Sequence, residues 1–496
     1  MSISKRFLTF IFTAPLALSF FAATELVAQQ YSGLKMPPGY IVGPELPDTA
    51  TKQQQTEWSR EYGPAKRRLN DGIKKVKEVL ATGGDVKSNP EARQFLEKVV
   101  FPAMTQTDLT LSNLGAKRKQ FLKDFLGKAV SQPARGSMID FTIETLRAYS
   151  TNAALHPSAR LNAVILISQL TDVPLNRGQA PRASRQAFDA LQQIFNGENE
   201  KEFPEYLKIA AFSGMKNQLE MNSKSGQSID ANAKGPLVEA VMKFLPEAAD
   251  PEKDALGYWR KRLAVQFAAV LKAPQTMTPL LAILKDDAAS FQLKLEVVKT
   301  ISETGSMANN PKTNGTVVAA VCGFAAKAVG DEATTIAATR EKMIRDGVLY
   351  GDFDLNQKTP IDFEPTLEDG SGRRGGDGSD TRAAIIELPN YQLNIFRDRL
   401  RAVAIFCPQA ITAASQQGGL DTKAQTLANG TNQALNALLK QANVGLVDVE
   451  VRVRGIEPTP QEKDQARKTS YVDQMVKVCE DSAKTLNEQR ASYDAE

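Results

Sequence analysis

Apolar residues recur at intervals of four positions through the middle of the chain. Three runs show this spacing most clearly: Leu207, Ala211, Met215 and Leu219; Trp259, Leu263, Phe267 and Leu271; and Leu293, Val297 and Ile301. Residues four positions apart share one face of an α-helix, so each run marks the apolar stripe of an amphipathic helix. The pattern predicts a mainly α-helical protein.

These helices are preceded by others of the same character, which makes pairs. The apolar positions of the preceding helices are Ile139, Ile143 and Leu146; Phe188, Leu191 and Phe195; Leu237, Val241 and Phe244; and Leu280, Leu281 and Leu284. Helix-breaking prolines such as Pro157 and Pro204 stand between the members of a pair. From about residue 132 the chain is predicted to repeat a helix–turn–helix unit.

The second helices of these pairs share a short signature. A basic residue is followed by Leu or Ile, then by any residue, then by Ala or Val; the copies begin at Arg160, Lys208, Arg262 and Lys294, with a further candidate at Arg399. The first four basic residues lie 48, 54 and 32 positions apart. Together with the apolar stripes, the signature indicates a structural repeat.

The helix pairs resemble HEAT repeats, whose second helix follows a short turn marked by proline and then carries a basic residue and an alanine. Residues 157–163, Pro-Ser-Ala-Arg-Leu-Asn-Ala, match that arrangement, and residues 284–287 resemble the turn between helices. The likeness covers about residues 132–305 and implies an α-solenoid of antiparallel helix pairs. Because the repeat length varies and the loop at 222–235 is long, a non-repeating helical bundle is the alternative.

The sequence pattern divides the chain into five segments. Residues 1–28 are predicted to be a signal peptide, and 29–50 form an extended leader rich in Pro and Gly. Residues 51–350 are predicted to form the HEAT-like solenoid, 351–381 a loop rich in Gly and Asp, and 382–496 a set of C-terminal helices with a short strand pair.

The strand pair is predicted from alternation near the C-terminus. Val447, Val449, Val451 and Val453 are separated by charged residues, which is the period of a half-buried strand. A strand needs a partner, and residues 383–388 are the best candidate.

The first residues predict an exported protein. Lys5 and Arg6 precede an apolar run over residues 7–23, and Ala28 supplies a small residue for cleavage. An uncleaved N-terminal anchor is the alternative. No later stretch reaches the ~20 apolar residues of a membrane span, so no integral span is expected after cleavage. We therefore expect a periplasmic or extracellular protein.

Charge and cysteine content narrow the classes of function. Residues 1–28 hold two basic residues and one acidic residue, so their removal lowers the formal charge from +4 to +3, and no nucleic-acid partner is expected. Cys322, Cys407 and Cys479 are predicted to be buried thiols, with a bridge between Cys322 and Cys407 as the alternative. The lone histidine, His156, stands at a turn before a proline, where a structural or exposed role is expected, so histidine-based triads are not predicted.

Three short motif matches lack the context that their chemistry requires. Residues 370–375 match a dinucleotide fingerprint, but no strand precedes them, and residues 213–216 match a serine–lysine motif inside a predicted helix. Asp352, Asp354 and Asn356 resemble the start of a calcium loop whose later positions fail. We therefore predict no catalytic residue, no cofactor site and no metal site.

The leading hypothesis is a non-catalytic helical-repeat scaffold that mediates protein–protein interaction in the cell envelope or outside the cell. The alternative is a carboxylate-based hydrolase acting on extracytoplasmic polysaccharide, because glycosidases need only two acidic residues. Sugar-binding aromatic residues are few, and of the two tryptophans, Trp58 and Trp259, the second is expected in the core. A self-assembling structural component is a third hypothesis.

Overall fold

The computed structural model describes residues 31, 33–43, 46–47, 49–106, 113–175, 180–225, 229–304, 310–345, 390–416, 418–453 and 471–494. Within these residues the protein is mainly α-helical, and its strands form one two-stranded sheet. The chain divides into two compact units, with the division between Ile229 and Asp230. The predicted signal peptide and the loop at 351–381 lie outside the described residues.

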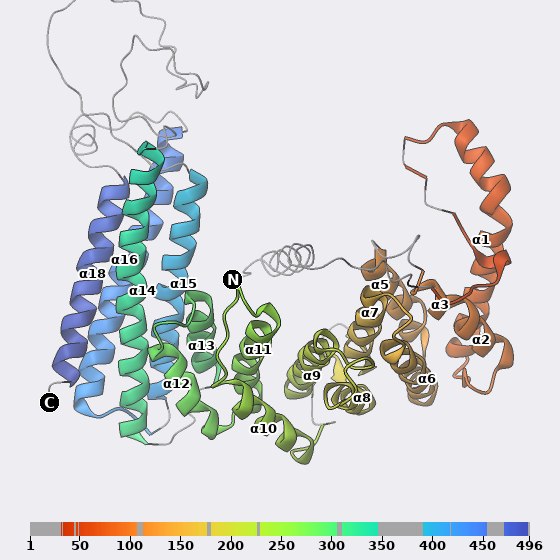
Figure 1. Ribbon diagram of the computed structural model, residues 1–496, viewed down its shortest axis with the longest axis horizontal. Coiled ribbons are helices and arrows are strands. Elements are labelled where there is room, and N and C mark those ends of the chain that lie inside the picture. Colours follow the sequence, from red (N-terminus) through yellow and green to blue (C-terminus); the bar gives the residue numbers. More distant parts are fainter. Residues whose placement is uncertain are drawn as a thin grey trace, which may run out of the picture. The chain divides into compact units, whose positions relative to one another are not determined.

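The first unit begins with a long helix and continues as packed helix pairs (Figure 1). Its helices and strands are α1 (Lys52–Ala81), α2 (Pro90–Phe95), α3 (Phe101–Ala103), α5 (Leu114–Asp124), α6 (Gln132–Thr151), α7 (Pro157–Ser168), β1 (Thr171–Val173), β2 (Arg182–Ala183), α8 (Arg185–Phe195) and α9 (Glu205–Ser225). Short 3-10 turns at Pro38–Tyr40 and Leu126–Lys128, and a π-helical turn at Leu96–Val100, join them.

Local sequence signals account for where α1 begins and ends. The Thr51 hydroxyl accepts from the Gln54 amide while the Gln54 side chain accepts from the Thr51 amide, which makes a reciprocal capping box. At the other end Gly83 has a φ of 78°, a left-handed conformation that glycine adopts at little cost. Pro64 lies inside this helix, which is continuous on both sides of it.

In the first unit the helix pairs stack in two layers. Helix α6 packs against α7, and α8 packs against α9. Across the pairs α6 contacts α8, and α7 contacts α9, so first helices lie beside first helices and second helices beside second helices. Phe101 holds the preceding segment to this stack, because its ring contacts the rings of Phe121 and Phe141 with centroids 5.4 and 5.9 Å away.

The second unit continues the same alternation and ends in four long helices. Its helices are α10 (Gly235–Phe244), α11 (Ala255–Leu271), α12 (Met277–Lys285), α13 (Phe291–Thr304), α14 (Pro311–Arg345), α15 (Asn390–Ser415), α16 (Thr422–Val453) and α18 (Tyr471–Asp494), with 3-10 turns at Asn232–Lys234 and Pro274–Thr276. Helix α13 packs between α11 and α15, while α12 packs on α14.

Helices α14, α15, α16 and α18 lie side by side as a bundle (Figure 1). Asn314 at the start of α14 donates to the Gly419 carbonyl just after α15, so α14 and α15 run antiparallel. A Cβ placed on Gly430 of α16 would touch Gln489 of α18, and a Cβ on Gly323 of α14 would touch Arg490 of α18. These glycines leave room for the Gln489 and Arg490 side chains of α18 against its two neighbours.

The strand predicted at Val447–Val453 is wrong, because these residues continue α16 as helix. A helix that is already formed gains one backbone hydrogen bond for each residue it adds, whereas an isolated strand must find a partner. The proposed partner at 383–388 lies outside the described residues. The sheet that the structure does contain, β1 with β2, was not predicted.

Candidate functional site

Two basic residues of the repeat signature, Arg160 and Lys294, are buried. Arg160 of α7 is 5% exposed; its Nε donates to the Ser150 carbonyl at 2.7 Å, and its Nη2 donates to the Lys201 and Glu202 carbonyls. One guanidinium therefore satisfies the end of α6 and the loop before α9.

In the second unit a buried basic residue again donates to a backbone carbonyl of a turn, but it lies one position before the signature residue. Lys261, one residue before the predicted Arg262, is buried in α11 and donates from Nζ to the Glu247 carbonyl at 2.7 Å. Lys294 is buried at the fourth position of α13, and its burial lowers its pKa. These basic residues hold the turns together and are not available to a ligand.

Arg262 instead takes part in a surface contact chain across α11 and α13. Its guanidinium lies over the Trp259 ring, 5.1 Å from the centroid, and its Nη2 lies 3.3 Å from Glu296 Oε2. Gln266 Nε2 donates to Glu296 Oε1 at 3.0 Å. Trp259 was expected in the core, and this is wrong: its ring is half-buried and is covered by a charged side chain.

The contact chain continues onto α15. Lys299 is one helical turn from Glu296 on α13, and its Nζ lies 4.7 Å from the centroid of Phe406. We call the six half-buried residues of this chain the second-helix face; they are Trp259, Arg262, Gln266, Glu296, Lys299 and Phe406. Next to it, Ile405 is 40% exposed. The face combines aromatic rings and cations on three alternate helices, α11, α13 and α15.

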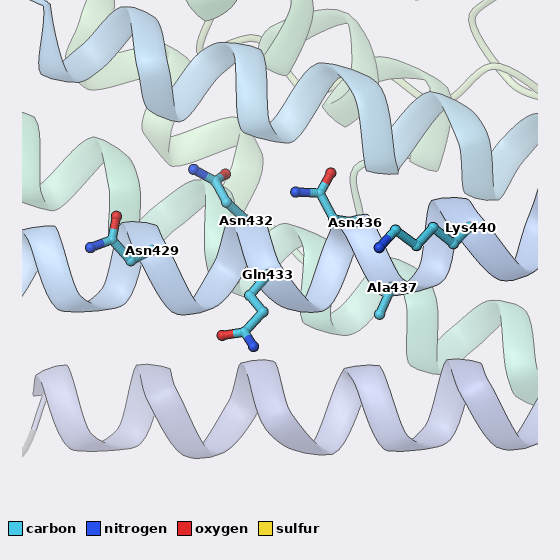
Figure 2. A pocket seen from close by; sticks show the side chains of 6 residues that line it. All are labelled: Asn429, Asn432, Gln433, Asn436, Ala437 and Lys440. Carbon is cyan, nitrogen blue, oxygen red and sulfur yellow. The ribbon is translucent and has the colours of Figure 1, made fainter.

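A polar hollow of about 540 Å³ lies on the outer side of α16 and is lined by Asn429, Asn432, Gln433, Asn436, Ala437 and Lys440 (Figure 2). Asn432 and Asn436 point toward one neighbouring helix and Gln433 toward the other. The Asn432 Oδ1 atom is buried and has no hydrogen-bond partner among the described residues. Carboxamides both donate and accept, so this hollow suits peptide groups or hydroxyl groups, and its lining holds no nucleophile or carboxylate.

Glu332 of α14 is the most perturbed carboxyl among the described residues of the second unit. It is 3% exposed, its Oε2 lies 3.5 Å from Arg399 Nε, and its Oε1 is buried without a hydrogen-bond partner among the described residues. Burial raises the pKa of Glu332 to about 7, against the opposing effect of Arg399. This pKa would suit a general acid, but the side chain is enclosed between helices of the bundle.

The structure assigns His156 a local role. It is the N-cap residue of α7, its Nδ1 accepts from the Ser158 amide at 3.1 Å, and its ring meets Tyr31 edge to face at 5.1 Å. Burial lowers the pKa of His156, which keeps the ring neutral and able to accept that bond. The predicted structural role of His156 is confirmed.

The cysteines are free and buried, as predicted. Burial raises the pKa of Cys479 to about 12 and that of Cys407 further, so neither thiol is activated. Cys322 lies in α14 with its Sγ 3.6 Å from the Leu486 carbonyl.

The motif matches give no site within the described residues. Ser213 and Lys216 lie in α9, where Lys216 Nζ pairs with Glu220 at 2.7 Å. Asp352, Asp354 and Asn356, and the glycine-rich stretch 370–375, lie outside the described residues. Among the described residues, no three His, Cys, Asp or Glu side chains are grouped so as to hold a metal ion, and no helix has the length and apolarity to cross a membrane.

Sequence reasoning missed the second-helix face and the hollow on α16. Each residue of the face is unremarkable in sequence, and the face exists only because α13 packs between α11 and α15. A signal for the hollow was present: Asn429, Asn432, Gln433 and Asn436 recur at helical spacing, which marks a carboxamide stripe.

Comparison of the chain with protein-family models, with curated proteins and with solved structures gives no match.

Proposed function

We propose that the protein is an exported, non-catalytic scaffold of HEAT-like helix pairs that binds another protein in the cell envelope or outside the cell. One observation carries the proposal: residues of the second-helix face link α11 to α13 through Arg262 and Glu296, and α13 to α15 through Lys299 and Phe406.

Stacked helix pairs favour this kind of function. Each amphipathic pair buries one face against the next, so the second helices expose a row of side chains along the stack. The alternation of first and second helices within each unit is the packing expected of a HEAT-like solenoid. Such rows are suited to binding proteins because they present a wide surface on rigid elements.

The composition of the face also supports protein binding. Tryptophan and arginine are enriched among the residues that contribute most to protein–protein affinity, and a ring stacked on a guanidinium is held in one position before the partner arrives. Trp259 with Arg262 has this arrangement, and Phe406 with Lys299 repeats it. The face carries both cations, Arg262 and Lys299, and an anion, Glu296, so it suits a partner with both kinds of charge.

The test uses the mature chain with crosslinking and mass spectrometry in the envelope fraction of its own cell. We expect a stoichiometric partner whose crosslinks lie on α11, α13 and α15. Trp259→Ala and Phe406→Ala should each weaken capture at least about tenfold, since loss of a central aromatic contact costs about 2 kcal/mol or more. Trp58→Ala, on α1, is the matched control and should capture as the wild type does.

Equal capture by all three variants would contradict a role for this face. Absence of any partner, together with a glycan-hydrolysing activity of the wild-type chain, would instead support the alternative function of a carboxylate-based hydrolase.

A further inference from the structure

A second hollow, of about 280 Å³, lies in the first unit, remote in sequence from the residues of the proposed protein-binding face. Helix α6, the β1–β2 pair and the first turn of α8 surround it. Its lining residues are Gln132, Gly136, Ile139, Asp172, Arg182, Arg185 and Gln186. The volume is just below the usual range of about 300–1,000 Å³ for ligand pockets, so it suits a small ligand.

Buried hydrogen bonds fix the walls of this cavity. Arg135 of α6 donates to the carbonyl and the hydroxyl of Thr171, at 2.7 and 2.9 Å, and so holds β1 in place. Gln218 of α9 is fully buried; it accepts from the Ser184 amide at 2.9 Å and donates to the carbonyls of Ser168 and Leu170. The strand pair is therefore positioned from both sides, and the cavity is formed before any ligand arrives.

The charged groups of the lining favour an anion. Two arginines, Arg182 and Arg185, and one carboxylate, Asp172, line the cavity. Arg185 is already paired with Asp189, so among the described residues Arg182 is the lining arginine without an ion pair. Arg185 Nε donates to both oxygens of Asp189, at 2.8 and 3.0 Å, which orients its guanidinium. Arg182 Nε is buried and has no hydrogen-bond partner among the described residues.

Because Nε is closed to solvent, an oxyanion in the cavity would meet Arg182 at the terminal nitrogens of its guanidinium, where charge-assisted hydrogen bonds to an oxyanion are strong. Gln132 and Arg185 are the first residues of α6 and α8, so two helix N-termini add partial positive charge to the same cavity. Asp172 opposes a dianion but can accept from a donor group on the ligand.

We infer that this cavity binds the carboxylate of a small ligand that also carries a hydrogen-bond donor. Arg182 and Arg185 hold the carboxylate, and Asp172 accepts from the donor. A free amino acid and the C-terminal residue of a peptide both present this chemistry.

Gly136 supplies a steric test. A Cβ built at Gly136 meets no atom within 4 Å, so Gly136→Ala keeps the cavity open, whereas Gly136→Leu places a branched side chain in it. Arg182→Gln removes the charge and the guanidinium donors. Arg147→Gln, at an exposed position of α6, is its matched control.

The probes are alanine, acetyl-alanyl-alanine, the same dipeptide with an amidated C-terminus, and inorganic phosphate, each titrated by calorimetry into the full mature chain. We expect saturable binding of alanine or of the free-acid dipeptide, and none of the amidated one. Arg182→Gln and Gly136→Leu should weaken binding about tenfold to a hundredfold, as expected for loss of a charged hydrogen bond. Gly136→Ala and Arg147→Gln should bind as the wild type does.

Preference for alanine assigns a free amino acid, and preference for the dipeptide assigns a protein C-terminus. Tighter binding of phosphate than of either carboxylate, or equal binding by Arg182→Gln and Arg147→Gln with both variants folded by circular dichroism, would overturn the inference.

Discussion

At the scale of single residues, Glu332 carries a buried carboxyl whose ionised form is unfavourable in the folded chain. Burial removes the Glu332 carboxyl from water. Its ion pair with Arg399, which has 40% of its side chain exposed, offsets only part of the lost hydration. The raised pKa, near 7, means that the ionised form of Glu332 is less favourable in the folded chain than in the unfolded one.

A pH dependence of stability follows with a definite sign. Below about pH 4.5, the ordinary pKa of the group, Glu332 is protonated in both states and costs nothing. As the pH rises to 7 and beyond, the folded chain must hold a proton that the unfolded chain has released, or bury a charge, so this residue lowers stability progressively across that window.

Glu332→Gln keeps the shape of the protonated side chain and removes its charge. We expect the variant to melt about 2–4 °C above the wild type at pH 8, which corresponds to a gain of about 1 kcal/mol, and to match it at pH 4.5. Glu341→Gln is the control, because Glu341 is exposed, lies in the same helix and undergoes the same change of side chain. Calorimetric melting of the three proteins at both pH values decides, and a Glu332→Gln variant that melts lower at pH 8 would refute the argument.

At the scale of elements, helices were predictable because burial of a helix face imposes a period on the sequence. The stripes through Leu207, Leu263 and Leu293 each mark a helix of the structure, α9, α11 and α13. Alternation at Val447–Val453 misled because period two predicts a strand only where a neighbour completes its hydrogen bonds. The strands that do form span three and two residues, too short to show a period at all.

The candidate sites were harder to predict from the sequence than the helices were. The lining of the carboxylate cavity comes from residues between 132 and 186 on four elements, and only the packing of α6, β1, β2 and α8 brings them together. The basic signature, by contrast, was visible in sequence, yet its meaning was structural: Arg160 joins the ends of neighbouring elements.

The Arg160 contacts predict a large effect on stability. Arg160→Met keeps the aliphatic stem but leaves the Ser150 carbonyl and the loop carbonyls at 201–202 without their donor, so we expect a loss of about 2–4 kcal/mol. Lys208→Met changes the corresponding signature position, where the side chain is only half-buried, and should cost less than about 1 kcal/mol. Urea unfolding followed by circular dichroism measures both; equal losses would show that the signature does not act through these carbonyls.

At the scale of the whole molecule, the hydrogen bonds on either side of the division between Ile229 and Asp230 stay within one unit each. Asn222 of α9 is buried and binds Ile229 on both backbone groups, donating to its carbonyl at 3.2 Å and accepting from its amide at 3.0 Å. The next residue, Asp230, accepts from the Ala233 amide at 2.9 Å and so begins the first turn of the second unit. Neither unit shares these bonds with the other.

Each unit also has its own core: aromatic rings around Phe101 in the first, and the long helices α14, α15, α16 and α18 in the second. We therefore expect residues 29–229 and 230–496, expressed separately, to fold, each with one cooperative transition that reappears in the full chain. A cut four residues earlier is the matched control, since it removes Ile229 from Asn222 and should lower the melting temperature of the first fragment only. Circular dichroism and amide exchange measure this, and a fragment 230–496 that stays unfolded would mean that the second unit depends on the first.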